Sequence, residues 1–431
     1  MTAGSATNYG AAYDGQPVKP ADPSLSTWRR IVRSAWLVPV PILLLYGLWL
    51  FASYGPGHDP RDAAFLGRHF VQQSQVSSTI KFDPSYSYPG GDVGYDGQFA
   101  YYIALDPLNA RYYMDAPSYR YTRIVYPLLA RLLAAGQRAL IPYALLVINW
   151  LAIVGGTLAV AAWLRRKGVW PWFALAYGLY PGLFITLQRD TTEALGYALA
   201  ALGVFLWDYG GRWRIALAAC SFSIAALTRE TTAVFPVVYA LSLLFAAPAD
   251  QGRPTGLPGR LVPAIAVGAL AVAPLLIYKA FLLVWLGTAG DPGIPLEHVP
   301  FLGLLIVPRS PGWFDGIGMV VVPALIAATA ALLVVLRRPR SVEPWLVLVN
   351  VLLFVVLLDR LSYVDISASG RVTSGVVLAA VLCLPEATRV LRTRSWFWAS
   401  SALWLSLVPL WVLIPEFKYL LEVTRGLRHS L

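Results

Sequence analysis

Long apolar runs separated by short polar segments recur along nearly the whole chain, and they constrain its fold more than any other feature. A helix needs about 20 predominantly apolar residues to cross the hydrocarbon core of a bilayer, and several of these runs approach that length. The sequence therefore predicts an all-α polytopic membrane protein with about eleven transmembrane helices. The predicted spans cover approximately residues 35–53, 140–164, 170–187, 193–208, 213–228, 232–247, 261–285, 317–336, 344–358, 371–388 and 396–414.

The composition supports a membrane protein and argues against a nucleic-acid-binding protein. Of the 431 residues, 57% are hydrophobic and only 13% are charged, whereas soluble domains carry about 25% charged residues. The net charge of +11 comes from short cationic clusters between apolar runs, which is the pattern that sets membrane topology. Cys220 and Cys383 each fall inside an apolar run, so we interpret both as small core residues.

The basic clusters predict which segments face the cytoplasm. Residues 1–28 are expected to form a disordered cytoplasmic tail, and Arg29, Arg30 and Arg33 precede a first span that acts as an uncleaved anchor. When the spans alternate from a cytoplasmic N-terminus, all strong basic clusters fall on the cytoplasmic side, as the positive-inside rule requires. These clusters are Arg165-Arg166-Lys167, Arg212 with Arg214, Arg253 with Arg260, Arg337-Arg338-Pro339-Arg340, and Arg389 with Arg392 and Arg394.

The first loop, residues 54–138, is predicted to be extracytoplasmic and contains the most distinctive motif of the chain. Its segment 90–102 is glycine-rich, polar and aromatic, and it carries two carboxylates, Asp92 and Asp96. Carboxylates in turn-prone backbone, surrounded by Tyr and Gln side chains, suit a site that binds a polyhydroxylated substrate at a membrane surface. The alternative is that Tyr95-Asp96-Gly97 only forms a turn, because Asp-Gly is a common turn pair.

A later segment of the same loop predicts an amphipathic helix. Ile124, Leu128 and Leu132 recur at helical spacing, while Arg123 and Arg131 interrupt the apolar pattern. Such a helix suits a position along the membrane interface. The alternative is a short helix of the soluble kind that packs on the loop.

Ionisable residues at the ends of several spans fall on the same side as the long loop. Charged groups at the edge of a bilayer are costly, so they usually have a partner or a task. We expect them to share a polar cavity, although Arg229 and Glu230 could instead mark the head-group end of a tight helical hairpin. The residues concerned are Arg189, Asp190, Glu193, Arg229, Glu230, Asp359, Arg360, Asp365 and Arg371.

Several familiar catalytic motifs are absent from the sequence. It has no Gly-rich phosphate loop followed by Lys and no G-x-S-x-G motif, which argues against soluble-nucleotide and serine-hydrolase chemistry. None of the four histidines has the spacing of a metal site. An enzyme built on this chain would therefore need an activated donor that is itself membrane-bound.

Four segments resemble a family of bacterial polytopic proteins linked to the formation of cell-surface glycopolymers. This family lies within the GT-C class of glycosyltransferases, which depend on polyprenyl-phosphate sugars. The resemblance spans most of the chain and implies one transmembrane domain over residues 29–431. The matching segments are Gly94-Tyr95-Asp96-Gly97-Gln98-Phe99 with Ala104-Leu105-Asp106-Pro107, Arg123-Ile124-Val125-Tyr126-Pro127-Leu128-Leu129, Leu227-Thr228-Arg229-Glu230, and Ser369-Gly370-Arg371-Val372.

The resemblance implies an enzyme of the bacterial cytoplasmic membrane whose active site lies in the first extracytoplasmic loop. In that class an acidic loop residue acts as catalytic base, and the candidates here are Asp96 and then Asp92. A phosphate leaving group needs a fixed cation, and arginine offers a planar, permanently charged donor fork. The candidates for binding the donor phosphate are Arg371, Arg123 and Arg229, and those for binding substrate are Tyr95, Gln98, Tyr102, Asp106 and Glu230.

The implied reaction moves a sugar from a polyprenyl-phosphate donor to a cell-envelope glycan or lipid acceptor, and it requires no metal or other cofactor. Membrane lipids are then partners of the protein, and nucleic acid is not. Two other functions fit the sequence: a secondary transporter or flippase of lipid-linked sugars, and a non-catalytic scaffold for glycopolymer assembly. Transporters tend to place their charges near the bilayer midplane, whereas the predicted charges here gather at one face, which favours an enzyme.

Overall fold

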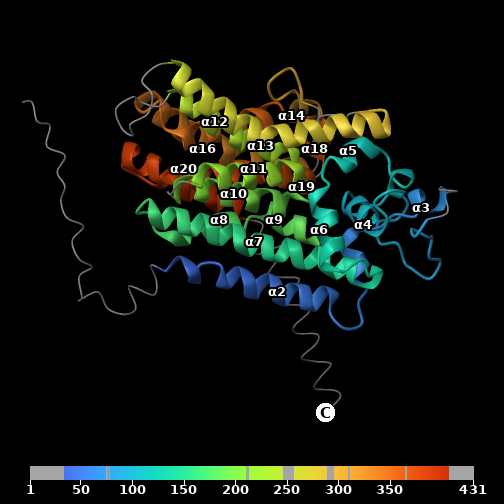
Figure 1. The fold of residues 1–431 in the computed structure, drawn as a ribbon. Helices are drawn as coiled ribbons and strands as arrows, with labels where there is room; N and C mark the ends of the chain where they lie inside the picture. Colours follow the sequence, from blue (N-terminus) through green and yellow to red (C-terminus); the bar gives the residue numbers. More distant parts are fainter. Residues whose placement is uncertain are drawn as a thin grey trace, which may run out of the picture.

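The computed structural model describes residues 34–73, 76, 78–209, 213–245, 257–288, 296–308, 311–364 and 366–406 (Figure 1). The predicted tail, the end of the last predicted span and the charged residue Asp365 lie outside these ranges. Within them the regular secondary structure is helical, and a single antiparallel bridge joins Leu296 to Leu358.

Five helical segments of the described chain are long and apolar enough to cross a bilayer, which confirms the prediction of a helical membrane protein. Three shorter apolar segments accompany them. The finer count of eleven spans stays a prediction. The five long segments are Ala35–Tyr54, Arg138–Arg166, Ala264–Leu286, Ile317–Arg337 and Ser374–Leu391, and the shorter ones are Arg214–Thr228, Glu230–Leu244 and Val342–Val356.

Two prolines divide the predicted span 170–187 into short helices. Proline has no N–H to donate and favours an extended conformation in the residue before it. Trp170 and Tyr180 accordingly have extended backbone, and a new helix begins at the proline that follows each. The three pieces are η5 (Pro171–Ala174), α8 (Leu175–Gly178) and α9 (Pro181–Gln188).

The remaining helices fall into two groups, a loop region (residues 55–137) at one end and a bundle (Figure 1). The loop region contains η2 (Pro60–Ala64), α3 (His69–Gln73), α4 (Gly97–Leu105), η3 (Ala110–Tyr112), α5 (Pro117–Tyr121) and α6 (Val125–Leu133). The bundle contains η1 (Ala35–Leu37), α2 (Val40–Tyr54), η4 (Arg138–Leu140), α7 (Ile141–Arg166), α10 (Glu193–Tyr209), α11 (Arg214–Thr228), η6 (Glu230–Ala233), α12 (Val234–Phe245), α13 (Leu257–Leu286), α14 (Leu302–Ile306), α15 (Pro311–Gly316), η8 (Ile317–Val321), α16 (Val322–Arg337), α17 (Val342–Val351), η9 (Leu352–Val356), α18 (Arg360–Val364), α19 (Ile366–Val372), α20 (Ser374–Leu391) and α21 (Ser395–Trp404).

Small residues bring the helices of the bundle close together. Helix α10 packs against α7 and α11, and α17 packs against α16 and α20. A Cβ atom added at Gly203 would lie 2.6 Å from the ring of Phe222, and one at Gly156 would lie 3.0 Å from Ala198. In a bilayer, where lipid is as apolar as the side chains, close packing at small residues is a main source of helix association.

The loop region has its own aromatic core and is fixed to one end of the bundle. Tyr121 packs edge-on against Trp285 of α13, with 5.0 Å between ring centroids. The Tyr126 hydroxyl donates to the carbonyl of Leu145 in α7 at 3.0 Å. These contacts attach the loop region to the bundle, so its residues can share a site with residues of the bundle.

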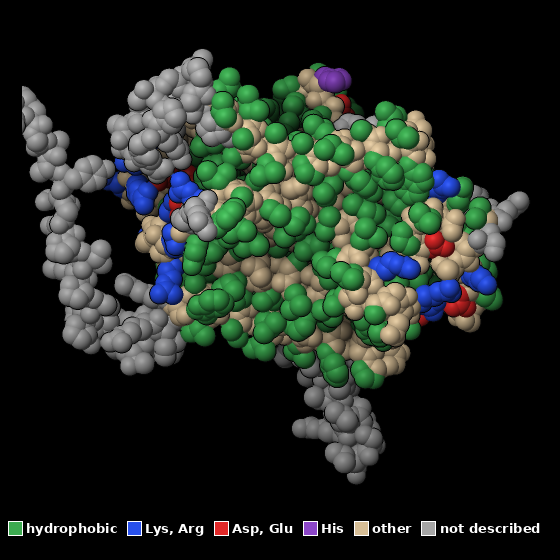
Figure 2. Space-filling view, viewed as in Figure 1, with side chains coloured by type: hydrophobic (Ala, Val, Ile, Leu, Met, Phe, Trp, Pro, Cys, Tyr) green, Lys and Arg blue, Asp and Glu red, His purple; other side chains and the backbone are tan. Residues whose placement is uncertain are grey.

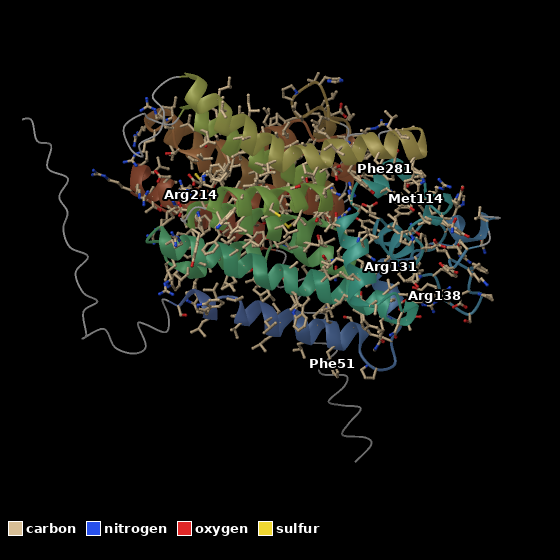
Figure 3. The ribbon with its side chains drawn as sticks, viewed as in Figure 1. Phe51, Met114, Arg131, Arg138, Arg214 and Phe281 are labelled. Carbon is tan, nitrogen blue, oxygen red and sulfur yellow. The ribbon has the colours of Figure 1, made fainter. Side chains whose placement is uncertain are left out.

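Charged side chains gather at the two ends of the molecule, and hydrophobic surface lies between them (Figure 2). Arg131 and Arg138 lie at the loop-region end, whereas Arg214 lies at the opposite end (Figure 3). Such a pattern is typical of a protein whose middle is surrounded by lipid.

The described members of the predicted basic clusters share the end opposite the loop region. Glu343, at the start of α17, lies within electrostatic range of Lys167 and Glu386 and so connects the clusters of α7 and α20. Arg212 and Arg253 lie outside the described residues. Which side of the membrane this end faces stays a prediction. Its ion pairs include Lys167–Asp208 (2.8 Å), Arg338–Glu386 (3.4 Å) and Arg389–Glu386 (2.5 Å).

A helix forms where the sequence predicts the amphipathic one, and its apolar side faces outward. Arg131 donates to the carbonyls of Ala104 and Leu105, at 2.9 and 2.8 Å, and so neutralises the C-terminal end of α4. Leu132 is 76% exposed, and its leucine neighbours in α6 are also exposed. A soluble helix would turn these leucines inward, so the orientation favours the membrane interface over the alternative of a helix packed on the loop.

Candidate functional site

Glycines in the segment 90–97 fold the chain into a turn that presents Asp96 at the start of α4. Gly94 has φ +75°, a backbone conformation that L-residues with side chains rarely adopt. A side chain at Gly97 would collide with the backbone carbonyl of Arg189, so α4 begins directly against the segment that precedes α10. The turn expected from the sequence is therefore present, and it also positions a carboxylate.

The carboxylate of Asp96 lies between two arginines from distant parts of the chain. Its Oδ1 is 2.8 Å from Nη1 of Arg120 in α5, and its Oδ2 is 3.1 Å from Nη2 of Arg371 in α19. The side chain is 31% exposed, so the carboxylate is both paired and accessible. Burial favours the neutral acid, but the guanidiniums of Arg371, Arg120 and Arg123 outweigh it and hold the pKa of Asp96 well below its usual range.

Arg371 connects Asp96 to a second, completely buried carboxylate. Its Nη1 is 3.0 Å from Oε1 of Glu193, the first residue of α10, which has no exposed side-chain surface. The same Glu193 oxygen is 3.4 Å from Nη2 of Arg229. Arg371 also donates to the hydroxyl of Tyr95 at 2.9 Å. The Arg371 guanidinium on α19 therefore contacts both the loop motif and α10 through hydrogen bonds and ion pairs.

Two glycines allow α19 to carry Arg371 to this position. A Cβ at Gly182, in α9, would overlap the carbonyl of Gly370, so the two helices meet at their backbones. Ser367, one turn before Arg371, shares a 2.8 Å hydrogen bond with the Tyr95 hydroxyl. The Ser-Gly pair that precedes Arg371 thus serves close packing.

A parallel ion pair joins the segment just before α6 to the first residue of η6. Arg123 donates to Glu230 through Nη2 at 2.9 Å and through Nε at 3.2 Å, and both side chains are nearly inaccessible. Arg123 also donates to the hydroxyl of Tyr119. A buried guanidinium–carboxylate pair with two bonds is geometrically specific and fixes α6 against the bundle. The hairpin interpretation of Arg229 and Glu230 is therefore too simple, because both residues bind side chains of other segments.

The structure brings together six of the candidate residues and separates four. Asp96, Tyr95, Arg371 and Arg229 belong to the ion-pair network around Asp96, and Arg123 and Glu230 form the parallel pair, whose arginine lines the same cavity as Asp96. Asp92 is 79% exposed at its side chain and pairs with Arg68 at 3.2 Å. Gln98 supports the turn, accepting from Gly67 N at 3.1 Å and donating to the Val93 carbonyl at 2.8 Å. Tyr102 is buried in the loop-region core, and Asp106 accepts hydrogen bonds from Thr79 and Asn109.

Two members of the network were not among the candidates chosen from the motifs. Arg120 binds Asp96 on one side and Asp115 on the other, each at 2.8 Å. The sequence feature that could have identified Arg120 is its distance from Arg123, because three residues correspond to about one helical turn. Glu193 had been grouped with the span-end charges, and its central place follows only from the contact between α10 and α19.

Other charged residues at the ends of spans stabilise the structure outside the network. Asp359 accepts from the backbone N–H of Leu361 at 3.1 Å and from the Ser362 hydroxyl at 2.6 Å, and so caps α18. The guanidinium of Arg189 stacks on Phe65, 3.7 Å from the ring centroid. The predicted polar cavity therefore includes only part of the charged set.

A small cavity of about 20 Å³ opens beside Asp96. Its lining combines apolar residues, Phe99, Ala100 and Ile103 of α4 with Pro127 of α6, and polar ones. The polar residues of the lining are Asp96, Arg120, Arg123, Asp190, Thr191 and Thr192.

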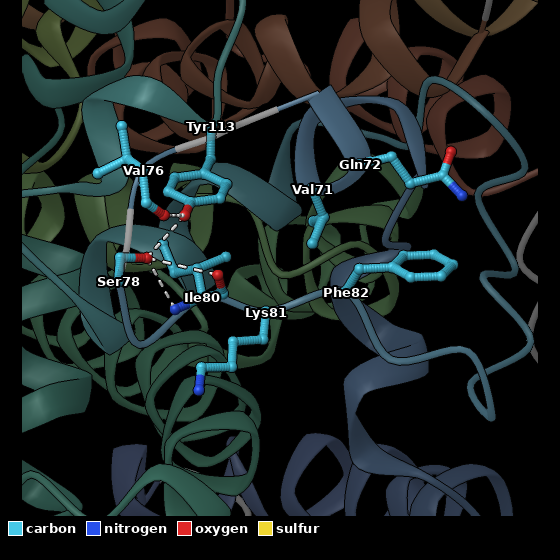
Figure 4. A pocket seen from close by; sticks show the side chains of 8 residues that line it. All are labelled: Val71, Gln72, Val76, Ser78, Ile80, Lys81, Phe82 and Tyr113. Atoms are coloured by element: carbon cyan, nitrogen blue, oxygen red, sulfur yellow. Dashed lines mark hydrogen bonds between the residues drawn. The ribbon is translucent and has the colours of Figure 1, made fainter.

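A larger hollow of about 360 Å³ lies elsewhere in the loop region (Figure 4). Tyr113 donates to the Val76 carbonyl and accepts from the Ser78 hydroxyl, each at 2.8 Å. The hydrogen bonds drawn there join Val76, Ser78, Ile80 and Tyr113, and Lys81 is the one basic side chain in the lining. This hollow lacks the carboxylate–arginine chemistry found around Asp96.

Comparisons of the chain with models of protein families, with curated proteins and with solved structures gave no match. No group of three or more His, Cys, Asp or Glu side chains in the described ranges is arranged to hold a metal ion. The arrangement of Asp96 and its arginines therefore carries the functional argument.

Proposed function

We propose that this protein is an integral-membrane glycosyltransferase that moves a sugar from a polyprenyl-phosphate donor to a cell-envelope glycan or lipid acceptor. The observation that supports it is the accessible carboxylate of Asp96 between Arg120 and Arg371, at one end of an apolar bundle. Transfer from a phosphate-bound sugar needs a base for the acceptor hydroxyl and cations for the leaving phosphate. Both kinds of group meet at Asp96.

The proposed reaction is a single displacement. The acceptor oxygen forms a bond to the anomeric carbon, while the bond between that carbon and the phosphate oxygen breaks. The phosphate keeps the bonding electron pair, and the acceptor's hydroxyl proton passes to Asp96. The configuration at the anomeric carbon is inverted, and the developing charge on the phosphate is stabilised by guanidinium groups.

The ion pairs of Asp96 suggest how donor binding prepares the base. A carboxylate between two guanidiniums has little affinity for a proton, which makes it a weak base. A lipid phosphate that binds Arg371 or Arg120 would compete with Asp96 for the same donors. Asp96 would then lose a partner and gain proton affinity at the moment when the acceptor must be deprotonated.

The surroundings of the network favour a lipid-linked donor. Helix α6 supplies Pro127 to the lining of the cavity beside Asp96 and carries exposed leucines from Leu128 onward, so an apolar surface lies on the same helix as part of the site. A polyprenyl chain can lie against such a surface while its phosphate reaches the arginines. We place the protein in the bacterial cytoplasmic membrane with the loop region on the extracytoplasmic side, acting without a metal or other cofactor.

A flippase of lipid-linked sugars remains the second candidate, because a network that binds a lipid phosphate need not perform chemistry. The position of the network at one end of the bundle, next to the loop region, favours the enzyme over a transporter with a midplane site.

The test uses the full-length protein in lipid nanodiscs with a panel of radiolabelled polyprenyl-phosphate hexoses and pentoses and a cell-envelope glycan extract. We expect transfer by the wild type, none by Asp96→Asn, and normal transfer by Asp83→Asn, which removes an acid paired with Arg61 elsewhere in the loop region. Donor binding without transfer would instead support a flippase or a scaffold.

A further inference from the structure

Asp190 is a buried carboxyl group that the ion-pair network leaves out. It lies between α9 and α10, has no exposed surface, and adopts φ +47°, which Asp tolerates better than most residues. Within the described residues no Lys or Arg pairs with it, although several arginines are close. Arg120 is bound to Asp96 and Asp115, and Arg123 is bound to Glu230.

The hydrogen bonding of Asp190 is also incomplete. Its Oδ1 is 3.4 Å from the hydroxyl of Tyr126, and that hydroxyl has a closer acceptor in the Leu145 carbonyl at 3.0 Å. Asn149 donates to Tyr126 rather than to Asp190. The second oxygen, Oδ2, is buried and has no hydrogen-bond partner in the described chain.

An ionised carboxylate without a counter-ion is too costly to bury, so the group takes up a proton instead. Burial raises the pKa of Asp190 well above its usual range, and the contact with Tyr126 opposes this only in part. The titratable and charged groups around it are Asp96, Arg120 and Arg123 across the cavity, Tyr126 from α6, Tyr54 from α2, and Arg189 and Glu193 in its own segment.

Asp190 lines the same small cavity as Asp96. Two carboxyl groups on one cavity therefore have opposite environments, since one is held ionised by arginines and the other is held neutral by burial. Pairs of this kind are typical of sites where one acid accepts a proton and the other donates a hydrogen bond.

We infer that Asp190 remains a neutral carboxylic acid and donates a hydrogen bond from its Oδ2 to a hydroxyl oxygen of the sugar-bearing substrate. This inference rests on the proposed function. Asp190 and Thr192 both line the cavity, and each has a buried oxygen without a hydrogen-bond partner in the described chain, so a substrate hydroxyl group that enters it would meet unpaired polar atoms. The cavity of about 20 Å³ admits a single hydroxyl group, because one water needs about 10–15 Å³ in the same measure.

The test is infrared spectroscopy of the full-length protein in nanodiscs at neutral pH. We expect a carbonyl band of an un-ionised carboxylic acid in the wild type that is absent from Asp190→Asn. The same band persists in the control Asp208→Asn, whose carboxylate pairs with Lys167 at the opposite end. The band shifts when a farnesyl-phosphate-linked hexose or pentose binds, and does not shift with farnesyl phosphate alone.

Transfer activity provides a second measurement. Asp190→Leu loses about 10- to 100-fold in kcat/KM, the effect of one missing donor to a buried acceptor, and Asp190→Asn, which keeps a neutral donor, loses less than Asp190→Leu. Absence of the band, or a band unmoved by a bound sugar probe, would overturn the role of Asp190 and leave the proposed function intact. A shift with farnesyl phosphate alone would assign the contact to the phosphate instead. Failure of every probe to bind would reject the proposed function as well.

Discussion

The guanidinium of Arg371 lies 3.1 Å from the carboxylate of Asp96, although 275 residues separate the two in the sequence. Arg371 simultaneously binds Glu193, whose carboxylate is completely buried. A buried charge requires a fixed partner, so the ion pair with Glu193 holds Arg371 in place while its other terminal nitrogen binds Asp96. The arginine is thus preorganised to exchange Asp96 for another anion.

Preorganisation of this kind distinguishes a binding site from an accidental surface contact. Exposed ion pairs contribute about 0–1 kcal/mol and rearrange freely. In the network around Asp96, the carboxylates of Asp96 and Asp115 are partly exposed, while Glu193, Arg371 and Arg229 are buried. An incoming phosphate would therefore displace Asp96 and leave the remaining pairs intact.

The first prediction concerns the base. Asp96→Asn keeps the shape of the side chain but cannot accept the acceptor's proton, so transfer should fall by about 10²- to 10⁴-fold. Asp92→Asn should retain wild-type activity, because the Asp92 side chain is 79% exposed and pairs with Arg68, away from the network. The measurement is the initial rate of sugar transfer by equal amounts of folded protein. Equal rates for wild type and Asp96→Asn would remove Asp96 from the mechanism.

The second prediction concerns the donor phosphate. Arg371→Lys retains the charge but cannot bind Glu193 and a phosphate through separate nitrogens of a planar fork. Arg371→Ala removes both charge and fork. We expect activity and affinity for a polyprenyl-phosphate sugar analogue to decrease from wild type to Lys to Ala. If both variants bind the analogue as tightly as the wild type does, Arg371 has a structural role and does not bind the donor.

The third prediction concerns stability. Removing one partner of the buried pair Arg123–Glu230 leaves an uncompensated charge, so Arg123→Ala and Glu230→Ala should each cost about 3–5 kcal/mol. The double variant should lose less than the sum of the two, as measured by denaturant unfolding in detergent. The exposed pair Arg68–Asp92 is the control and should show a coupling of about 0–1 kcal/mol. Equal coupling in the two pairs would mean that the Arg123–Glu230 contact is not buried in solution.

Hydropathy alone predicts the helical membrane character of this chain, because a bilayer imposes the same length and composition on every span. It does not predict where helices break. The stretch 170–187 is uniformly apolar, yet Pro171 and Pro181 divide it. The outward position of the leucines in α6 was also foreseeable, since alternation of Arg and Leu at helical spacing marks an interface.

The sequence predicted several individual residues of the site, but it did not predict the contacts between them. Asp96 and Arg371 were both expected to be functional, whereas their contact depends on how α19 packs against α9. The helical geometry of α4 explains the candidates that fall outside the network. Gln98 and Tyr102 lie four residues apart on one face of α4 and do not line the cavity beside Asp96, whereas Phe99 and Ile103 both belong to the loop-region core and line that cavity.

The fourth prediction concerns acid pH. Burial disfavours the charge of Asp96, but Arg371, Arg120 and Arg123 more than compensate, so its pKa in the folded protein is lowered. A lowered pKa contributes stability that is present above the unfolded value, about 3.9, and is lost as the pH falls through the folded value. Between pH 5 and 8 this group should leave the unfolding temperature unchanged. Below about pH 4, the wild type should lose stability more steeply than Asp96→Asn, and parallel curves would contradict the ion pairs.

The last prediction concerns the side of the membrane on which the site lies. The described basic clusters share the end opposite the loop region, and the positive-inside rule places that end in the cytoplasm. In a background in which Cys220 and Cys383 are replaced by Ala, we introduce Asp92→Cys or Arg338→Cys, because both positions are exposed. A membrane-impermeant thiol reagent should label position 92 in intact cells and position 338 only after permeabilisation.

The reverse labelling would place Asp96 on the cytoplasmic side, where soluble nucleotide sugars are available. The reason for expecting a lipid-linked donor would then disappear, even if Asp96 and Arg371 still proved essential. Labelling at position 92 from outside would instead exclude cytoplasmic nucleotide sugars as direct donors, because they do not cross the membrane. The topology measurement therefore decides which donors are worth testing before any transfer assay is performed.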